Sequence, residues 1–63
     1  MPQFRIRFSL CKIDNEGNPL EETRKRYEET FEAKDESDAI DKVKRAHSQG
    51  MIAAYIEEVT LIE

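Results

Sequence analysis

Near its amino terminus the chain alternates between apolar and polar side chains, and this alternation limits the fold more than any other feature of the sequence. Residues 4–13 read FRIRFSLCKI. The apolar side chains that share one parity are Phe4, Ile6, Phe8 and Leu10, and the positions between them hold Arg5, Arg7, Ser9 and Cys11. Because successive side chains of a strand point to opposite faces, this period of two predicts a β-strand with one face in the core.

Residues 14–19 follow, and they are rich in residues that favour turns, so we expect the chain to reverse there. Residues 20–33 then fit two interpretations. Their many Glu, Arg and Lys residues favour a helix, whereas Tyr27, Phe31 and Ala33 share one parity, as in a strand. The reversal just before them is typical of a hairpin, so we expect a strand, with a helix as the alternative.

A hairpin that pivots between Gly17 and Asn18 pairs residues whose numbers sum to 35. This register places Arg7 opposite Glu28, a pair of opposite charges. It also places Ser9 opposite Arg26.

A helix is predicted over residues 36–49. Asp35 is placed to accept a hydrogen bond from the amide of Asp38, and acidic residues at the start and basic residues at the end match the helix dipole. The apolar stripe of this helix is formed by Ala39, Ile40, Val43 and Ala46. Gly50 is a natural stop.

The last segment, residues 52–62, predicts a third strand, in which Val59 and Leu61 share the parity of Tyr55 while Ile56 and Ile62 share the other. The expected fold is therefore α+β, in the order ββαβ: a three-stranded antiparallel sheet of order 2-1-3 with one helix packed on one face. We expect residues 1–63 to form a single domain, since a chain of this length holds one core. The other face of the sheet is left open.

The segment FEAKDESDAIDKVKRA, residues 31–46, resembles a pattern in small uncharacterised bacterial and phage proteins, in which a strand ends in an aromatic-x-Ala step and leads into a capped helix. The matching positions are Phe31, Ala33, Asp35, Ala39, Ile40 and Ala46. Some small phage proteins of this organisation block host defence systems by binding a protein surface. The resemblance implies such an inhibitory or accessory role here and assigns no functional residue.

Ten Lys and Arg residues stand against fourteen Asp and Glu residues, which gives a net charge of −4. Proteins that coat polyanions are usually basic overall, so this balance argues against that class. The single cysteine, Cys11, predicts a reducing compartment, because small secreted domains rely on several disulfides. With no apolar run of membrane-spanning length and no signal-peptide pattern, we expect a cytoplasmic protein that does not contact a membrane.

Catalytic and metal-binding residues are scarce. His47 is the only histidine and Cys11 the only thiol, and the predicted fold places them on opposite faces of the sheet. One His and one Cys fall short of a zinc site, and the two glycines form no phosphate loop. We therefore expect a non-enzymatic protein that carries no metal or cofactor.

The charge pattern that suggests binding is a set of arginines that the hairpin gathers on the open sheet face: Arg5, Arg7, Arg24 and Arg26. Together with Ile13, Ile56 and Ile62 nearby, they predict a protein interface, for which Arg and scattered apolar residues are favoured. The leading hypothesis is a protein-interaction module that acts through its open face or an edge strand, either on another protein or as a homodimer. The alternative is a single-stranded RNA binder that uses the four arginines.

Overall fold

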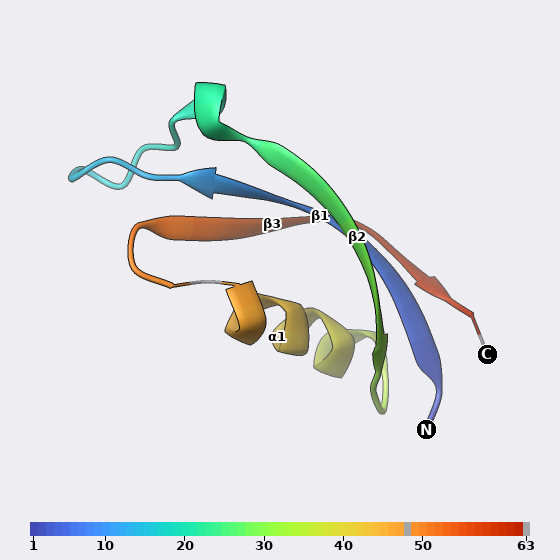
Figure 1. Cartoon of the computed structure of the whole chain (residues 1–63). Helices are drawn as coiled ribbons and strands as arrows, with labels where there is room; N and C mark the ends of the chain where they lie inside the picture. The colour runs from blue at the N-terminus through green and yellow to red at the C-terminus, as the bar shows by residue number, and fades with distance from the viewer. Residues whose placement is uncertain (48, 63) are drawn as a thin grey trace.

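The structure is a computed structural model that describes residues 1–47 and 49–62 (Figure 1). Its elements in chain order are the strand β1 (Gln3–Lys12), the short 3-10 helix η1 (Glu21–Thr23), the strand β2 (Lys25–Glu32), the helix α1 (Glu36–His47) and the strand β3 (Ile52–Leu61). The strands form one antiparallel sheet of order β2-β1-β3. This confirms the predicted α+β fold and its strand order.

The hairpin of β1 and β2 has the predicted register, with Arg7 opposite Glu28 and Ser9 opposite Arg26. The helix alternative for residues 20–33 is wrong, apart from the single turn of η1. The loop between the two strands is held by Asp14, whose carboxylate accepts the amides of Glu16 and Asn18, both at 2.9 Å. These bonds, that of Asn18 above all, lower the pKa of Asp14.

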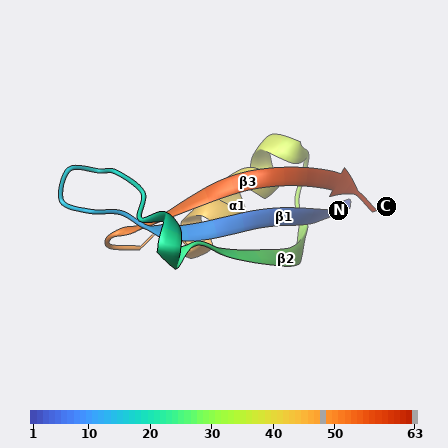
Figure 2. The ribbon, with the colours of Figure 1, turned by 90° about the horizontal axis from the view of Figure 1, so that it is seen from above.

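The helix packs on one face of the sheet, and Figure 2, which looks at the other face, shows α1 behind the strands. The fully buried side chains on the helix face of β1 are those of Ile6 and Phe8, and α1 contributes Ala39 and Val43. The Phe8 ring stacks on Tyr27 of β2 with 5.8 Å between ring centroids. The core is therefore narrow and centred on β1, as expected for the middle strand of a three-stranded sheet.

Both ends of α1 are fixed by side chains. Asp35 caps the amide of Asp38 as predicted, at 2.9 Å, and the Asp38 carboxylate accepts the amide of Lys34 at 3.0 Å. At the other end His47 lies against the Phe8 ring, with 4.9 Å between centroids, and its Nε2 is 3.0 Å from Oε1 of Glu29. The helix ends at His47, and the predicted extension to residue 49 includes Ser48, which lies outside the described residues.

The predicted apolar stripe of α1 is wrong at Ala46, which is exposed. The line that packs on the sheet runs instead through Ala39, Val43 and the half-buried His47, at a spacing of four residues. The imidazole ring of His47 fills the last position of this line, where it packs against the Phe8 ring.

The strand β3 contains a β-bulge, which sequence reasoning did not predict. Arg7 pairs with Glu58 and Phe8 with Ile56, so Glu57 is an extra residue on β3. The extra residue reverses the parity of the strand, and Ile56 therefore shares the helix face with Val59, while Tyr55 lies on the opposite face. The predicted grouping of Tyr55 with Val59 and Leu61 is wrong for this reason.

The molecule is elongated, with extents of 39 × 17 × 12 Å. Within the described ranges no helix has the length and apolar character needed to cross a membrane.

Candidate functional site

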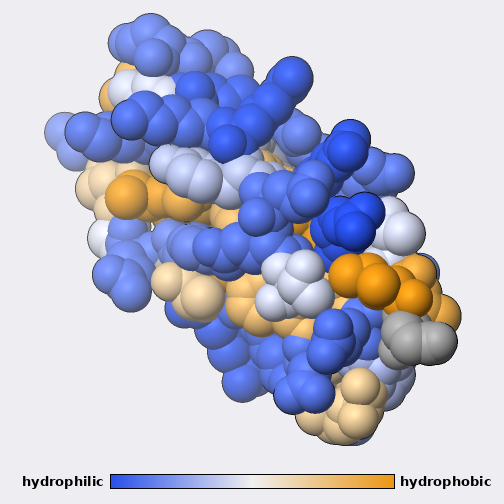
Figure 3. Space-filling model, turned by 45° about the vertical axis from the view of Figure 1, so that its right-hand side comes forward, coloured by the Kyte–Doolittle hydropathy of each residue, from blue (hydrophilic) through white to orange (hydrophobic). Residues whose placement is uncertain are grey.

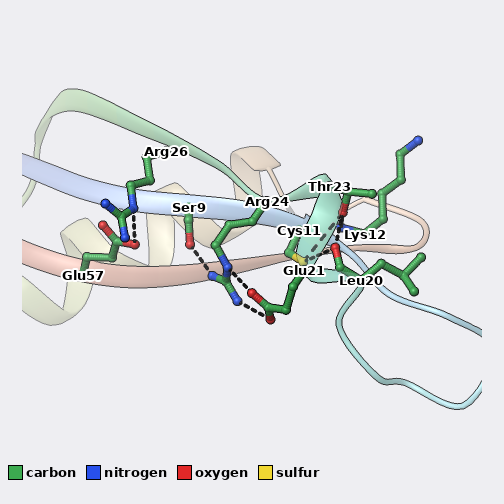
Figure 4. Close-up of polar contacts among 9 residues, drawn as sticks. All are labelled: Ser9, Cys11, Lys12, Leu20, Glu21, Thr23, Arg24, Arg26 and Glu57. Atoms are coloured by element: carbon green, nitrogen blue, oxygen red, sulfur yellow. Dashed lines mark hydrogen bonds and ion pairs between the residues drawn. The ribbon is translucent and has the colours of Figure 1, made fainter.

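The open face, which is the sheet face opposite α1, carries three of the four predicted arginines on its strands: Arg5 and Arg7 of β1 and Arg26 of β2. Each of the three lies within 4 Å of a carboxylate. Arg5 and Arg7 share Glu28, at 3.6 and 3.1 Å, and Arg7 also lies 3.5 Å from Glu58. Arg26 lies 3.6 Å from Glu57, as Figure 4 shows.

The bulge explains how these pairs form across three strands. It places Glu57 and Glu58 in succession beside the arginines of β1 and β2, so the open face carries alternating charges instead of a positive stripe. The structure therefore brings the three arginines together, as predicted, and neutralises them there. Exposed ion pairs of this kind contribute little to stability, about 0 to 1 kcal/mol each, but they cancel the field that would attract a polyanion.

Arg24 plays a different part, because it precedes β2 and reaches across the open face (Figure 4). Its guanidinium donates to the Ser9 hydroxyl at 2.7 Å and to both carboxylate oxygens of Glu21 at 2.8 Å. Its Cζ atom lies 4.9 Å from the centroid of the Tyr55 ring. We call this set of contacts the Arg24 clamp. Its charged hydrogen bonds raise the pKa of Arg24 and lower that of Glu21.

The clamp covers a second small cluster on the same face. The Thr23 hydroxyl donates to the Leu20 carbonyl at 2.7 Å and accepts the Lys12 amide at 2.9 Å. The thiol of Cys11 donates to the same carbonyl at 3.1 Å, and the Cys11 side chain is 1% exposed. Ser9 and Cys11 are therefore both buried by the loop, although they lie on the open face. No Cys-His pair forms, because His47 lies on the helix face.

The three predicted interface isoleucines are not brought together. Ile56 packs against the core on the helix face, away from the arginines. Ile13 is half-buried, and its amide donates to the Met51 carbonyl at 2.8 Å. Ile62 is exposed, but it lies at the opposite end of the sheet, where its amide donates to Gln3. These residues do not form one apolar patch with the arginines. Figure 3 likewise shows hydrophobic surface broken up by hydrophilic side chains.

The two edges of the sheet differ. The β2 edge carries five charged residues among its eight, KRYEETFE. In addition, Nζ of Lys42 lies 2.6 Å from the Glu32 carbonyl oxygen, and so occupies a backbone acceptor at the end of the strand. Charged side chains and an occupied acceptor are the usual protection of an edge strand against further pairing.

The β3 edge has little of this protection. Its ten residues, IAAYIEEVTL, include no Lys, Arg or Pro, and its two charged residues already pair with arginines of the open face. The bulge at Glu57 interrupts the edge and leaves an uncharged run, residues 52–56, which we call the β3 edge segment. Sequence reasoning offered the open face or an edge strand as the interface and did not choose between the two edges. The absence of Lys, Arg and Pro from residues 52–62 is a signal that could have done so.

Backbone pairing fixes which groups of the β3 edge segment face outward. Tyr55 pairs with Ser9 and Ala53 with Cys11, in the same register as the Ile13–Met51 hydrogen bond. Because hydrogen-bonded pairs alternate along an antiparallel ladder, the amide and carbonyl of Ala54 point away from β1. The Ile52 amide is taken up by the Gln49 carbonyl at 3.2 Å.

Among the described residues no group of three or more His, Cys, Asp or Glu side chains is arranged to hold a metal ion. Comparisons of the chain with protein families, with curated proteins and with solved structures found no match.

Proposed function

We propose that this chain is a non-enzymatic protein-interaction module that binds an extended segment of another protein along the β3 edge segment. The observation that carries the proposal is the difference between the two sheet edges. The β2 edge is densely charged and has a lysine on its last carbonyl, whereas residues 52–56 carry no charge. Adding a strand to such an edge gains main-chain hydrogen bonds, and side chains on alternate positions supply specificity.

Small side chains support this choice of segment. Ala53 and Ala54 stand next to each other at its centre, and Ala54 has the outward-facing amide and carbonyl. Methyl groups leave the backbone on either side accessible to a second strand. Tyr55, which is 37% exposed on the open face, would then pack beside side chains of the added strand.

A second copy of the chain is a less favourable occupant than a different protein. Full-length antiparallel pairing of β3 with itself would bring Glu57 of one copy close to Glu57 of the other, and each copy has a net charge of −4. Like charges in neighbouring strands oppose pairing. The proposal therefore commits to a different protein as the partner. Blocking a host protein by binding its surface is the role that the resemblance of residues 31–46 implies.

The test uses the outward amide of Ala54. Peptides that bind the chain would be selected from a library of extended sequences, and their affinities measured for the wild type, Ala54→Pro and Ala54→Val. Proline removes the outward amide, which edge strands tolerate, whereas valine keeps it. We expect Ala54→Pro to weaken binding at least about tenfold, the equivalent of one hydrogen bond in the bound strand, and Ala54→Val to weaken it far less.

Selected peptides that bind Ala54→Pro as tightly as the wild type would overturn the proposal. If the proline variant does not fold, a synthetic chain with an N-methyl group on Ala54 removes the same donor without the ring. Sedimentation equilibrium tests the choice of partner. A mass near 7.4 kDa is expected, and a doubled mass that Ala54→Pro returns to 7.4 kDa would show that the edge binds a second copy instead.

A further inference from the structure

The helix face of the sheet has an apolar hollow of about 180 Å³ near the end from which the hairpin loop leaves. Leu10, Tyr27 and Ile52 line it from the three strands, with Lys12, Lys25, Cys11 and Thr23 completing its wall. Ligand pockets for drug-sized molecules or cofactors are larger, roughly 300 to 1,000 Å³. The hollow is therefore suited to a single apolar side chain, and the Tyr27 ring, which is 43% exposed, offers such a side chain an aromatic face.

The two lysines of the hollow differ from the arginines of the open face. Across residues 1–47 and 49–62 neither Lys12 nor Lys25 has a carboxylate within ion-pair distance, whereas each of the four arginines on the open face has one. The pairing Leu10↔Lys25 and Lys12↔Ile52 places both lysines beside the apolar floor. An apolar hollow flanked by two unneutralised ammonium groups complements an apolar side chain that is flanked by carboxylates.

We infer that the hollow is a docking site for an acidic peptide segment, which inserts one large apolar side chain between Leu10, Tyr27 and Ile52 and places its carboxylates beside Lys12 and Lys25. An acidic peptide is favoured over a nucleic acid because two lysines form no track for a phosphate backbone. The apolar floor of the site, formed by Leu10, Tyr27 and Ile52, lies on the opposite face from the arginines. It shares only Ile52 with the β3 edge segment, and it does not depend on strand addition there.

The experiment is an NMR titration of the ¹⁵N-labelled full chain with the peptide acetyl-Asp-Asp-Phe-Asp-Asp-amide. The amide resonances of Leu10, Tyr27 and Ile52 are expected to shift together and to saturate at millimolar peptide. A matched peptide with alanine in place of phenylalanine separates insertion into the hollow from attraction by charge. It is expected to leave these three resonances nearly unchanged.

Two double variants with equal changes of charge identify the lysines involved. Lys12→Gln with Lys25→Gln is expected to weaken peptide binding about tenfold, while Lys34→Gln with Lys44→Gln, which changes two exposed lysines elsewhere, is expected to weaken it less than about twofold. All four side chains are exposed, so both variants are expected to fold. Ala54→Pro, which tests the β3 edge segment, should leave this binding unchanged.

Three results would overturn the inference: equal weakening by both double variants, equal shifts from the alanine peptide, or no shift of the hollow amides at millimolar peptide. Larger shifts of the same amides with a single-stranded oligonucleotide than with the peptide would also overturn it, because they would assign the hollow to nucleic acid.

Discussion

The guanidinium of Arg24 lies over the ring of Tyr55, with Cζ 4.9 Å from the ring centroid, and so joins the loop before β2 to the open face of β3. The same guanidinium donates to Ser9 on β1, the strand between them. One side chain therefore links the loop before β2 to both of the other strands, β1 and β3. Cation–π contacts and charged hydrogen bonds act together here, whereas the other arginines of the face make exposed ion pairs.

Replacing Arg24 should destabilise the fold more than replacing Arg26. Arg24→Ala removes the hydrogen bond of the fully buried Ser9 hydroxyl together with the contact on Tyr55, whereas Arg26 has a single ion pair and a side chain that is 79% exposed. We expect Arg24→Ala to lower the urea midpoint by about 0.5 to 1 M and Arg26→Ala by less than about 0.2 M. Equal decreases of the urea midpoint for the two variants would show that the Arg24 clamp stabilises the fold no more than an exposed ion pair does.

Charge on α1 should be tolerated at Ala46 and not at Ala39. Ala46 is exposed, whereas Ala39 is fully buried in the core cluster. We expect Ala46→Glu to change the free energy of unfolding by less than about 0.5 kcal/mol and Ala39→Glu to unfold the chain, because a carboxylate buried there has no partner. Circular dichroism with urea unfolding distinguishes these outcomes. A folded Ala39→Glu chain with normal stability would contradict the packing of α1.

Acid should weaken the fold through carboxylates whose pKa values are lowered on folding. The pKa of Asp38 is below its ordinary value of 3.8, mainly because its carboxylate accepts the Lys34 amide. A carboxyl group with a lowered folded pKa stabilises the fold fully above its unfolded pKa, and this contribution is lost as the pH falls through the lower, folded pKa. The urea midpoint, measured from about pH 6 to pH 2, should therefore decrease once the pH is below about 4.

Asp38→Asn is the matched variant for this measurement, since its amide oxygen can accept the same hydrogen bond but does not titrate. Its urea midpoint should fall less steeply with acid than that of the wild type. Some acid dependence should remain, because the pKa values of Asp14 and Glu21 are also lowered. Parallel curves for the two proteins would show that Asp38 does not contribute.

The RNA-binding alternative can be checked directly on the open face. Because Glu28, Glu57 and Glu58 neutralise the arginines of the strands, we expect no saturable binding of a labelled uridine oligonucleotide at physiological salt. Fluorescence anisotropy at low and physiological salt makes the measurement. Saturable binding that Arg5→Gln with Arg7→Gln weakens, with a smaller salt slope, would support the RNA alternative over the proposed function.

Local patterns in the sequence were sufficient to predict much of this fold. The alternation of residues 4–13, the turn at residues 14–19 and the cap at Asp35 each depend on a few neighbouring residues. Together they predict the elements and the register of the hairpin, and the right-handed crossover to the third strand predicts the strand order. The register of the hairpin follows from its pivot. With the turn centred between Gly17 and Asn18, Tyr27 falls opposite Phe8 and Phe31 falls opposite Phe4, so the four rings share one face.

The features that sequence reasoning missed depend on contacts between distant segments. A bulge leaves no local mark, so the parity of Ile56 could be assigned only once β3 was paired with β1. The same holds for Ala46, since the line along which α1 crosses the sheet decides which side chains are buried. The role of Arg24 depends on Ser9 and Tyr55, which lie far from it in sequence. From the sequence alone it is grouped with the other arginines of the open face and predicted to bind a partner.

The bulge also has a consequence for the length of the chain. Because Glu57 is the extra residue between the partners of Arg7 and Phe8, a deletion of Glu57 would leave every other side chain of β3 on its present face. A deletion farther along the strand would put the residues between the gap and the bulge on the opposite face. The Glu57–Glu58 pair, where removal of either residue gives the same sequence, is thus the place in β3 where the length of the chain can change by one residue while the core keeps the same members.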